Sequence, residues 1–119
     1  MKKILVIEDN ENNLYLIRFM LEKNGYQVIE AREGLAGVTL AIKEKPDLIL
    51  MDIQLPDING MEATRRIRVS EAGDKIPIVA VTSYAMVGDR EKALDAGCTG
   101  YIEKPIDPET FIGKIQQFL

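Results

Sequence analysis

The sequence predicts an α/β fold in which helices cover both faces of one parallel sheet of five strands. Short apolar runs alternate along the chain with stretches of helical spacing, which is typical of repeated strand–helix units. The clearest runs, at residues 4–7, 48–51 and 78–81, are continuously apolar, as strands buried on both faces must be. Because 119 residues have room for one such core, we expect residues 1–119 to form a single domain.

The expected elements follow one another as five such units. Strands are expected at residues 3–7, 27–31, 48–51, 76–81 and 100–102, and helices near 11–24, 34–44, 60–69, 88–96 and 108–119. Right-handed crossovers leave few topologies, and the flavodoxin-like, doubly wound order 2-1-3-4-5 is the commonest at this size. In such a sheet, ligands lie beyond the carboxyl ends of the strands, where the first and third strands meet.

Two helix starts carry recognisable signals. Asn59, with Glu62 three positions later, resembles a capping box. Asp107 before Pro108 suggests an N-cap acid followed by a first-turn proline. In the last helix, apolar residues recur at three- and four-residue spacings, which favours a core-packing face over a partner-binding one.

Composition limits the possible functions. A net charge of −4 argues against direct binding of nucleic acid, which requires Lys and Arg to neutralise phosphates. No apolar run is long enough to span a membrane or to form a signal-peptide core, so we expect a cytoplasmic protein. The single Cys98 cannot form an intramolecular disulfide and is expected to be a buried filler. The chain has no histidine, so any phosphohistidine donor must be another protein.

Polar residues follow the expected strands at their carboxyl ends. They are Glu8 and Asp9 after the first strand, Asp52 after the third, Thr82 after the fourth and Lys104 just past the fifth. Because the first and third strands are expected to be neighbours, roughly 5 Å apart, the three carboxylates should crowd together. Crowded carboxylates raise one another's pKa unless a cation relieves them. An oxygen-only cluster without His or Cys suits Mg²⁺.

These residues also supply what phosphoryl transfer requires. Lys104 could reach back across one strand toward Asp52, and Thr82 between them could present its hydroxyl. A carboxylate nucleophile, a divalent cation, an ammonium and a hydroxyl would then surround one point. Each residue alone could be an ordinary turn or strand-end residue, and their coincidence at one edge favours a site.

Two loop residues extend this site. The segment after Asp52 does not begin a helix at once, which leaves carbonyls such as that of Gln54 available to a metal. Pro105 after Lys104 could hold a cis bond that directs the lysine inward, although X-Pro bonds are usually trans.

Five motifs, in order and spacing, resemble those of one known family. They are residues 6–10 (VIEDN), 50–56 (LMDIQLP), 60–62 (GME), 80–82 (AVT) and 101–105 (YIEKP). Over essentially its whole length the chain is similar to the CheY-like receiver domain of two-component response regulators. Finer matches resemble single-domain regulators of the DivK type, while Glu8-Asp9-Asn10 with Asn13 resembles receivers attached to hybrid sensor kinases. We expect the former because the chain ends at the last helix.

The resemblance implies a role for each site residue. Asp52 would be the phosphoacceptor. Asp9 would bind Mg²⁺ directly, and Glu8 would bind it through water. The carbonyl of Gln54 would complete the metal's protein ligands. Lys104 would bind the phosphoryl group.

The resemblance also implies a switch and its partners. Thr82 and Tyr101, with Pro105 and a cis bond before it, would respond to phosphorylation. The phosphoryl group would come from a sensor histidine kinase or a histidine phosphotransfer protein. The surface of the fourth helix, fifth strand and fifth helix would then control a downstream protein, with Tyr84, Met86 and Val87 as candidate contacts. Gln54 and Tyr84 could also govern access of hydrolytic water.

The expected function is therefore that of a signalling phosphoacceptor which catalyses only its own phosphorylation and slow dephosphorylation. An aspartyl-phosphate phosphatase would carry an acid where Gln54 stands. A flavin or nucleotide module would need glycine in its first loop, and residues 8–13 contain none. A pseudo-receiver that only binds partners is disfavoured by intact Asp52, Thr82 and Lys104.

Overall fold

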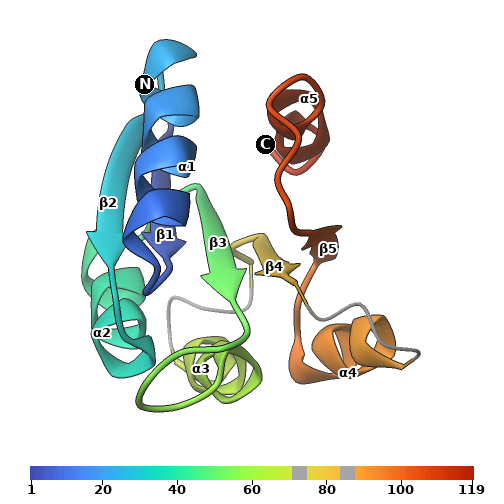
Figure 1. The fold of residues 1–119 in the computed structure, drawn as a ribbon. Helices are drawn as coiled ribbons and strands as arrows, with labels where there is room; N and C mark the ends of the chain where they lie inside the picture. The colour runs from blue at the N-terminus through green and yellow to red at the C-terminus, as the bar shows by residue number, and fades with distance from the viewer. Residues whose placement is uncertain (71–74, 84–87) are drawn as a thin grey trace.

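The computed structural model describes residues 1–70, 75–83 and 88–119. Its strands are β1 (Lys3–Ile7), β2 (Gln27–Ala31), β3 (Leu48–Asp52), β4 (Ile78–Thr82) and β5 (Gly100–Glu103). All neighbouring pairs are parallel, and their order is β2-β1-β3-β4-β5 (Figure 1). The fold class and strand order expected from the sequence are confirmed.

Helices lie on both faces of this sheet. They are α1 (Glu11–Lys23), α2 (Gly34–Glu44), α3 (Gly60–Arg68), α4 (Asp89–Ala96) and α5 (Phe111–Gln116). α1 and α5 cover one face, whereas α2, α3 and α4 cover the other (Figure 1). Among the helices of the described ranges, none combines the length and apolar character that a bilayer crossing requires.

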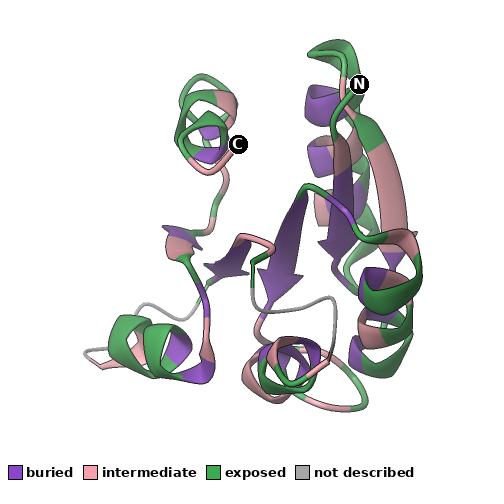
Figure 2. Cartoon of the chain, turned by 180° about the vertical axis from the view of Figure 1, so that it is seen from behind, coloured by how far each residue is buried: buried purple, intermediate pink, exposed green. Residues whose placement is uncertain are grey.

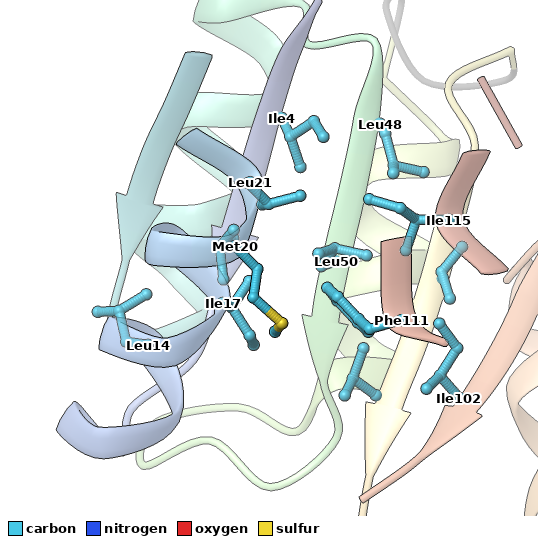
Figure 3. Packing of buried hydrophobic residues seen from close by; sticks show 13 residues of the cluster. Ile4, Leu14, Ile17, Met20, Leu21, Leu48, Leu50, Ile102, Phe111 and Ile115 are labelled. Atoms are coloured by element: carbon cyan, nitrogen blue, oxygen red, sulfur yellow. The ribbon is translucent and has the colours of Figure 1, made fainter. Parts of the chain in front are cut away.

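The sheet separates two apolar clusters. Alternate residues of each central strand point to opposite faces, so Ile4 and Val6 of β1 join one cluster while Leu5 and Ile7 join the other. β1, β3 and β4 are buried along almost their whole length, as their continuous apolar runs predicted (Figure 2). Figure 3 shows the cluster beneath α1 and α5, where Phe111 lies near Leu50. The apolar face of the last helix therefore packs on the core.

The start of the last helix differs from the prediction. α5 begins at Phe111 and not at residue 108, because residues 108–110 form a turn. The capping contacts predicted for Asp107 are nevertheless present, because its carboxylate accepts the N–H of Glu109 at 2.9 Å and its carbonyl accepts the N–H of Phe111 at 2.9 Å. The predicted cap at Asn59 is present, since its Oδ1 accepts the N–H of Glu62 at 2.9 Å.

Candidate functional site

The sheet places Glu8 and Asp52 side by side. Ile7 of β1 pairs with Met51 of β3, so the next residue of each strand reaches the same level. Both side chains are buried, with Glu8 2% and Asp52 6% exposed, whereas Asp9 is exposed. Carboxylate oxygens of Glu8, Asp9 and Asp52 lie within 4.8 Å of one another. The acidic cluster expected from the sequence is therefore present.

Lys104 reaches this cluster from the far side of β4. Thr82 pairs with Glu103, and the backbone N–H of Lys104 donates to the Thr82 carbonyl at 2.8 Å. The Lys104 ammonium lies 2.6 Å from Oε1 of Glu8 and 3.5 Å from Oδ1 of Asp52. The Lys104–Pro105 peptide bond is cis. Sequence reasoning directed Lys104 at Asp52 and missed Glu8 as its nearer partner.

The environment of Asp52 raises the pKa of its carboxyl group to about 7. Burial is the largest cause, followed by a hydrogen bond and charge repulsion from Glu8. The charge of Lys104 and the backbone N–H of Gln54, 3.3 Å from Oδ1 of Asp52, act in the opposite direction. A further positive charge would therefore stabilise the ionised carboxylate.

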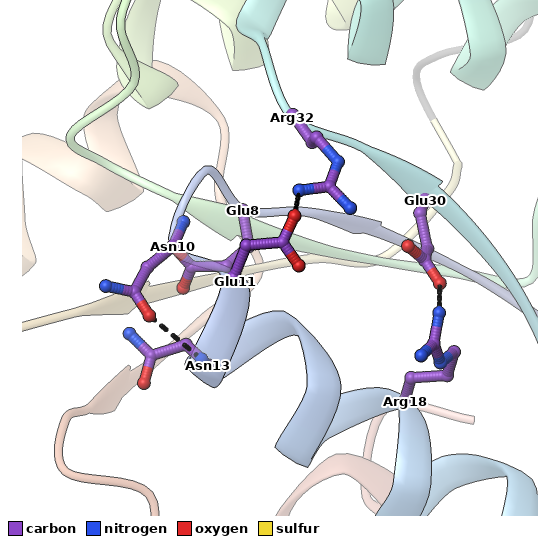
Figure 4. A network of polar contacts seen from close by, with 7 residues as sticks. All are labelled: Glu8, Asn10, Glu11, Asn13, Arg18, Glu30 and Arg32. Atoms are coloured by element: carbon purple, nitrogen blue, oxygen red, sulfur yellow. Dashed lines mark hydrogen bonds and ion pairs between the residues drawn. The ribbon is translucent and has the colours of Figure 1, made fainter.

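An open cleft above the carboxylates is lined mainly by polar groups. Its walls include Glu8, Asp9, Asn10, Asp52, Gln54 and Lys104. Asn10 begins α1 by accepting the N–H of Asn13 at 3.0 Å, and ion pairs Glu11–Arg32 and Arg18–Glu30 lie beyond it (Figure 4). Three carboxylates, without any thiolate or imidazole, form a donor set that fits a hard divalent cation such as Mg²⁺.

Thr82 and Tyr101 line a second cavity of about 210 Å³ beside this cleft. Thr82 is 2% exposed at the end of β4, and Tyr101 stands on the neighbouring strand. Gln54 and Asp89 also line the cavity. Burial, with the charge of Asp89, raises the pKa of the Tyr101 hydroxyl. Of the expected switch residues, Thr82 and Tyr101 thus share one cavity.

The candidate contacts Tyr84, Met86 and Val87 lie outside the described residues.

Asp57 was not singled out from the sequence, yet its carboxylate joins the loop after Asp52 to α2. The Pro-Asp pair predicts a turn, but no local pattern indicates that its partner is a helix more than twenty residues earlier.

Comparisons with known proteins agree on one family. The family model of the response regulator receiver domain matches residues 4–116. The chain is 45% identical over 118 residues to the polar-differentiation response regulator DivK of Brucella ovis, covering 99% of this chain and 96% of that protein.

Cys98 is buried, as expected.

Solved structures give the same result. One is the receiver domain of sensor histidine kinase PA1611 from Pseudomonas aeruginosa, crystallised with a magnesium ion coordinated in the active-site cleft. It is 39% identical, with a TM-score of 0.91 and coverage of 98% of this chain and 96% of that one. The chemotaxis protein CheY4 of Vibrio cholerae is 27% identical, with a TM-score of 0.94 and coverage of 100% and 99%.

Proposed function

Because this chain belongs to the response regulator receiver domains, which are signalling phosphoacceptors of two-component systems, we propose that Asp52 is its phosphoacceptor. One observation carries the proposal: the carboxyl group of Asp52, with its pKa raised to about 7, lies in an open cleft beside an ammonium and two further carboxylates. Strongly perturbed carboxyl groups in clefts are typical of reactive sites.

In the proposed reaction an oxygen of Asp52 attacks the phosphorus of a phosphohistidine on a partner protein. A P–O bond forms as the P–N bond breaks, and the released imidazole takes up a proton. Asp52 must be ionised to attack, and the nearby positive charge of Lys104 favours that form. Lys104 then moves from Glu8 toward the phosphoryl oxygens and balances their charge.

The metal would be held by Asp9, Asp52 and the backbone carbonyl of Gln54, with Glu8 acting through water. When bound, Mg²⁺ would neutralise charge on the phosphoryl oxygens during transfer. A cation at this place is supported by the acidic cluster of this chain and by the magnesium ion in the cleft of the related Pseudomonas receiver.

The response would pass through Thr82 and Tyr101. A phosphoryl group on Asp52 would draw the Thr82 hydroxyl toward it, and Tyr101 would move into the cavity that the two residues share. This is a local electrostatic change that biases a two-state element. The surface of α4, β5 and α5 would change with it and control a downstream protein.

The partners follow from this chemistry. With no histidine of its own, the chain would receive its phosphoryl group from a sensor histidine kinase or a histidine phosphotransfer protein in the cytoplasm. It would act as a switch that catalyses only its own phosphorylation and slow dephosphorylation.

Phosphorylation can be tested by incubating the protein with Mg²⁺ and a small-molecule phosphodonor, then measuring its intact mass. The wild-type chain should gain one phosphoryl group, and Asp52→Asn should gain none. Asp47→Asn is the matched control, because Asp47 accepts a hydrogen bond from the N–H of Lys3, at the start of β1 and away from the cleft. A wild-type chain that gains nothing, or an Asp52→Asn chain that gains as much, would overturn the assignment.

A further inference from the structure

The first turn of α2 is capped by a residue of a distant loop. Oδ1 of Asp57 accepts the N–H of Gly34 at 2.7 Å, and Oδ2 accepts the N–H of Leu35 at 2.8 Å. Within the described residues, Glu33 at the N-cap position makes no capping bond with its own side chain. Asp57 therefore satisfies helix donors that the local sequence does not, and its negative charge lies at the favourable end of the helix.

The helix and the loop are in close contact at this point. A Cβ atom on Gly34 would lie 2.5 Å from Cγ1 of Ile58, so only glycine permits the approach. One turn later, a Cβ atom on Gly37 would lie 2.5 Å from Cδ1 of Ile7. Ile7 immediately precedes Glu8. The start of α2 thus rests on the end of β1 and also holds the loop.

The same loop carries Gln54. It runs from β3 to α3 and bends toward α2 (Figure 1). At its base the N–H of Gly60 donates to the Ile53 carbonyl at 2.7 Å. Only two residues, Leu55 and Pro56, separate Gln54 from Asp57, so the two lie at most about 11 Å apart along the chain. Fixing the Asp57 carboxylate therefore restricts the positions that the Gln54 carbonyl can take.

We propose that Asp57 is a positioning residue for the metal site, whose bridge to α2 holds the Gln54 carbonyl facing the carboxylates of Asp9 and Asp52. This inference rests on the proposed role of Gln54 as a metal ligand. Asp57 is not among the residues that line the cleft, so it would not itself be a ligand. Mutation of a group that orients a metal ligand typically lowers metal affinity 10–100-fold. Loss of the Asp57 bridge should therefore weaken Mg²⁺ binding although Asp57 supplies no ligand.

The test is calorimetric titration of Mg²⁺ into folded protein, with folding checked by circular dichroism. Asp57→Ala should bind Mg²⁺ more weakly, with a dissociation constant raised about tenfold. Asp57→Asn, which keeps one acceptor oxygen, should lie between Asp57→Ala and wild type. Asp47→Ala is the matched control, since it also removes a carboxylate that accepts a backbone N–H from another element. It should leave Mg²⁺ affinity unchanged.

The outcomes separate this inference from the proposed function. A wild-type chain that does not bind Mg²⁺ overturns the metal site itself. A wild-type chain that binds, with Asp57→Ala within twofold of it, overturns only the positioning role. Loss of a distant charge would also weaken binding, so the titrations are repeated at 1 M salt, where the screening length is about 3 Å. An affinity difference that disappears there contradicts positioning. If Asp57→Ala does not fold, the Mg²⁺ affinity of Asp57→Asn is compared with that of wild type instead.

Discussion

The ammonium nitrogen of Lys104 lies 2.6 Å from Oε1 of Glu8, in an ion pair that is almost wholly withdrawn from solvent. The same nitrogen is 3.5 Å from Oδ1 of Asp52. One lysine therefore forms ion pairs with two buried carboxylates. A phosphoryl group on Asp52 would compete with Glu8 for that lysine.

Removing the lysine should destabilise the fold. Lys104→Met leaves Glu8 and Asp52 without their cation, and breaking a buried pair in this way costs about 3 kcal/mol of unfolding free energy. The double variant Glu8→Gln with Lys104→Met should regain part of that loss, because Glu8 no longer carries an unpaired charge while Asp52 still lacks its cation. Denaturant unfolding at neutral pH checks both. Losses that simply add would show that Glu8 and Lys104 are not coupled.

The raised pKa of Asp52 should make stability fall as pH rises. The folded carboxyl group titrates near pH 7 and an unfolded aspartate near about 3.9, so the folded state binds more protons between these values. The unfolding free energy of wild type relative to Asp52→Asn should therefore decrease by about 2 kcal/mol from pH 4 to pH 7, allowing for solvent screening in the open cleft. A relative stability that is constant or rising over this range would contradict the shift.

Mg²⁺ should raise the melting temperature through the acidic cluster. At ten times its dissociation constant, a ligand that binds only the folded state adds about 1.4 kcal/mol, which corresponds to a shift of a few degrees. Asp9→Ala should abolish most of this shift while leaving the metal-free melting temperature similar, because Asp9 is exposed. Differential scanning calorimetry measures both. An equal shift in the variant would exclude Asp9 as a ligand.

Two glycines provide a matched pair for the packing behind Asp52. A Cβ atom on Gly60 would lie 2.1 Å from the backbone oxygen of Asp52, whereas around Gly113 in α5 the described residues leave the space within 4 Å open. Gly60→Ala should cost about 2 kcal/mol through overpacking and should slow phosphorylation of Asp52. Gly113→Ala should stabilise the domain by about 0.5–1 kcal/mol. Thermal unfolding and phosphorylation rates distinguish the two.

Sequence reasoning succeeded where a local pattern determines the structure. The apolar runs predicted the positions of β1 and β3 and most of β4, which begins at Ile78 and not at residue 76, and the strand ends brought Glu8, Asp52 and Lys104 to one edge. It failed where long-range contacts decide. The bond between Asp57 and α2 joins segments far apart in the sequence, and no periodicity records such a bond.

The start of α5 was missed for a related reason. Asp107 and Pro108 are compatible with a helix start and equally with a turn, and the hydrogen bond that Asp107 accepts from Glu109 occurs in both, so this pair does not determine where the regular helix begins. The nearer ion-pair partner of Lys104 could not be predicted from the sequence either. Its strand position was predictable, but choosing Glu8 over Asp52 as the nearer partner depends on side-chain lengths within a packed cleft.

The packing of Gly60 against the backbone of Asp52 has a consequence for partner choice. β3 is buried throughout, β1 and β4 flank it, and the start of α3 is pressed against the Asp52 carbonyl. If Asp52 is the phosphoacceptor, it could not move far to meet its donor. The proposed kinase would then have to bring its phosphohistidine to a fixed point, so selection among kinases would depend on how each one contacts the rim of the cleft.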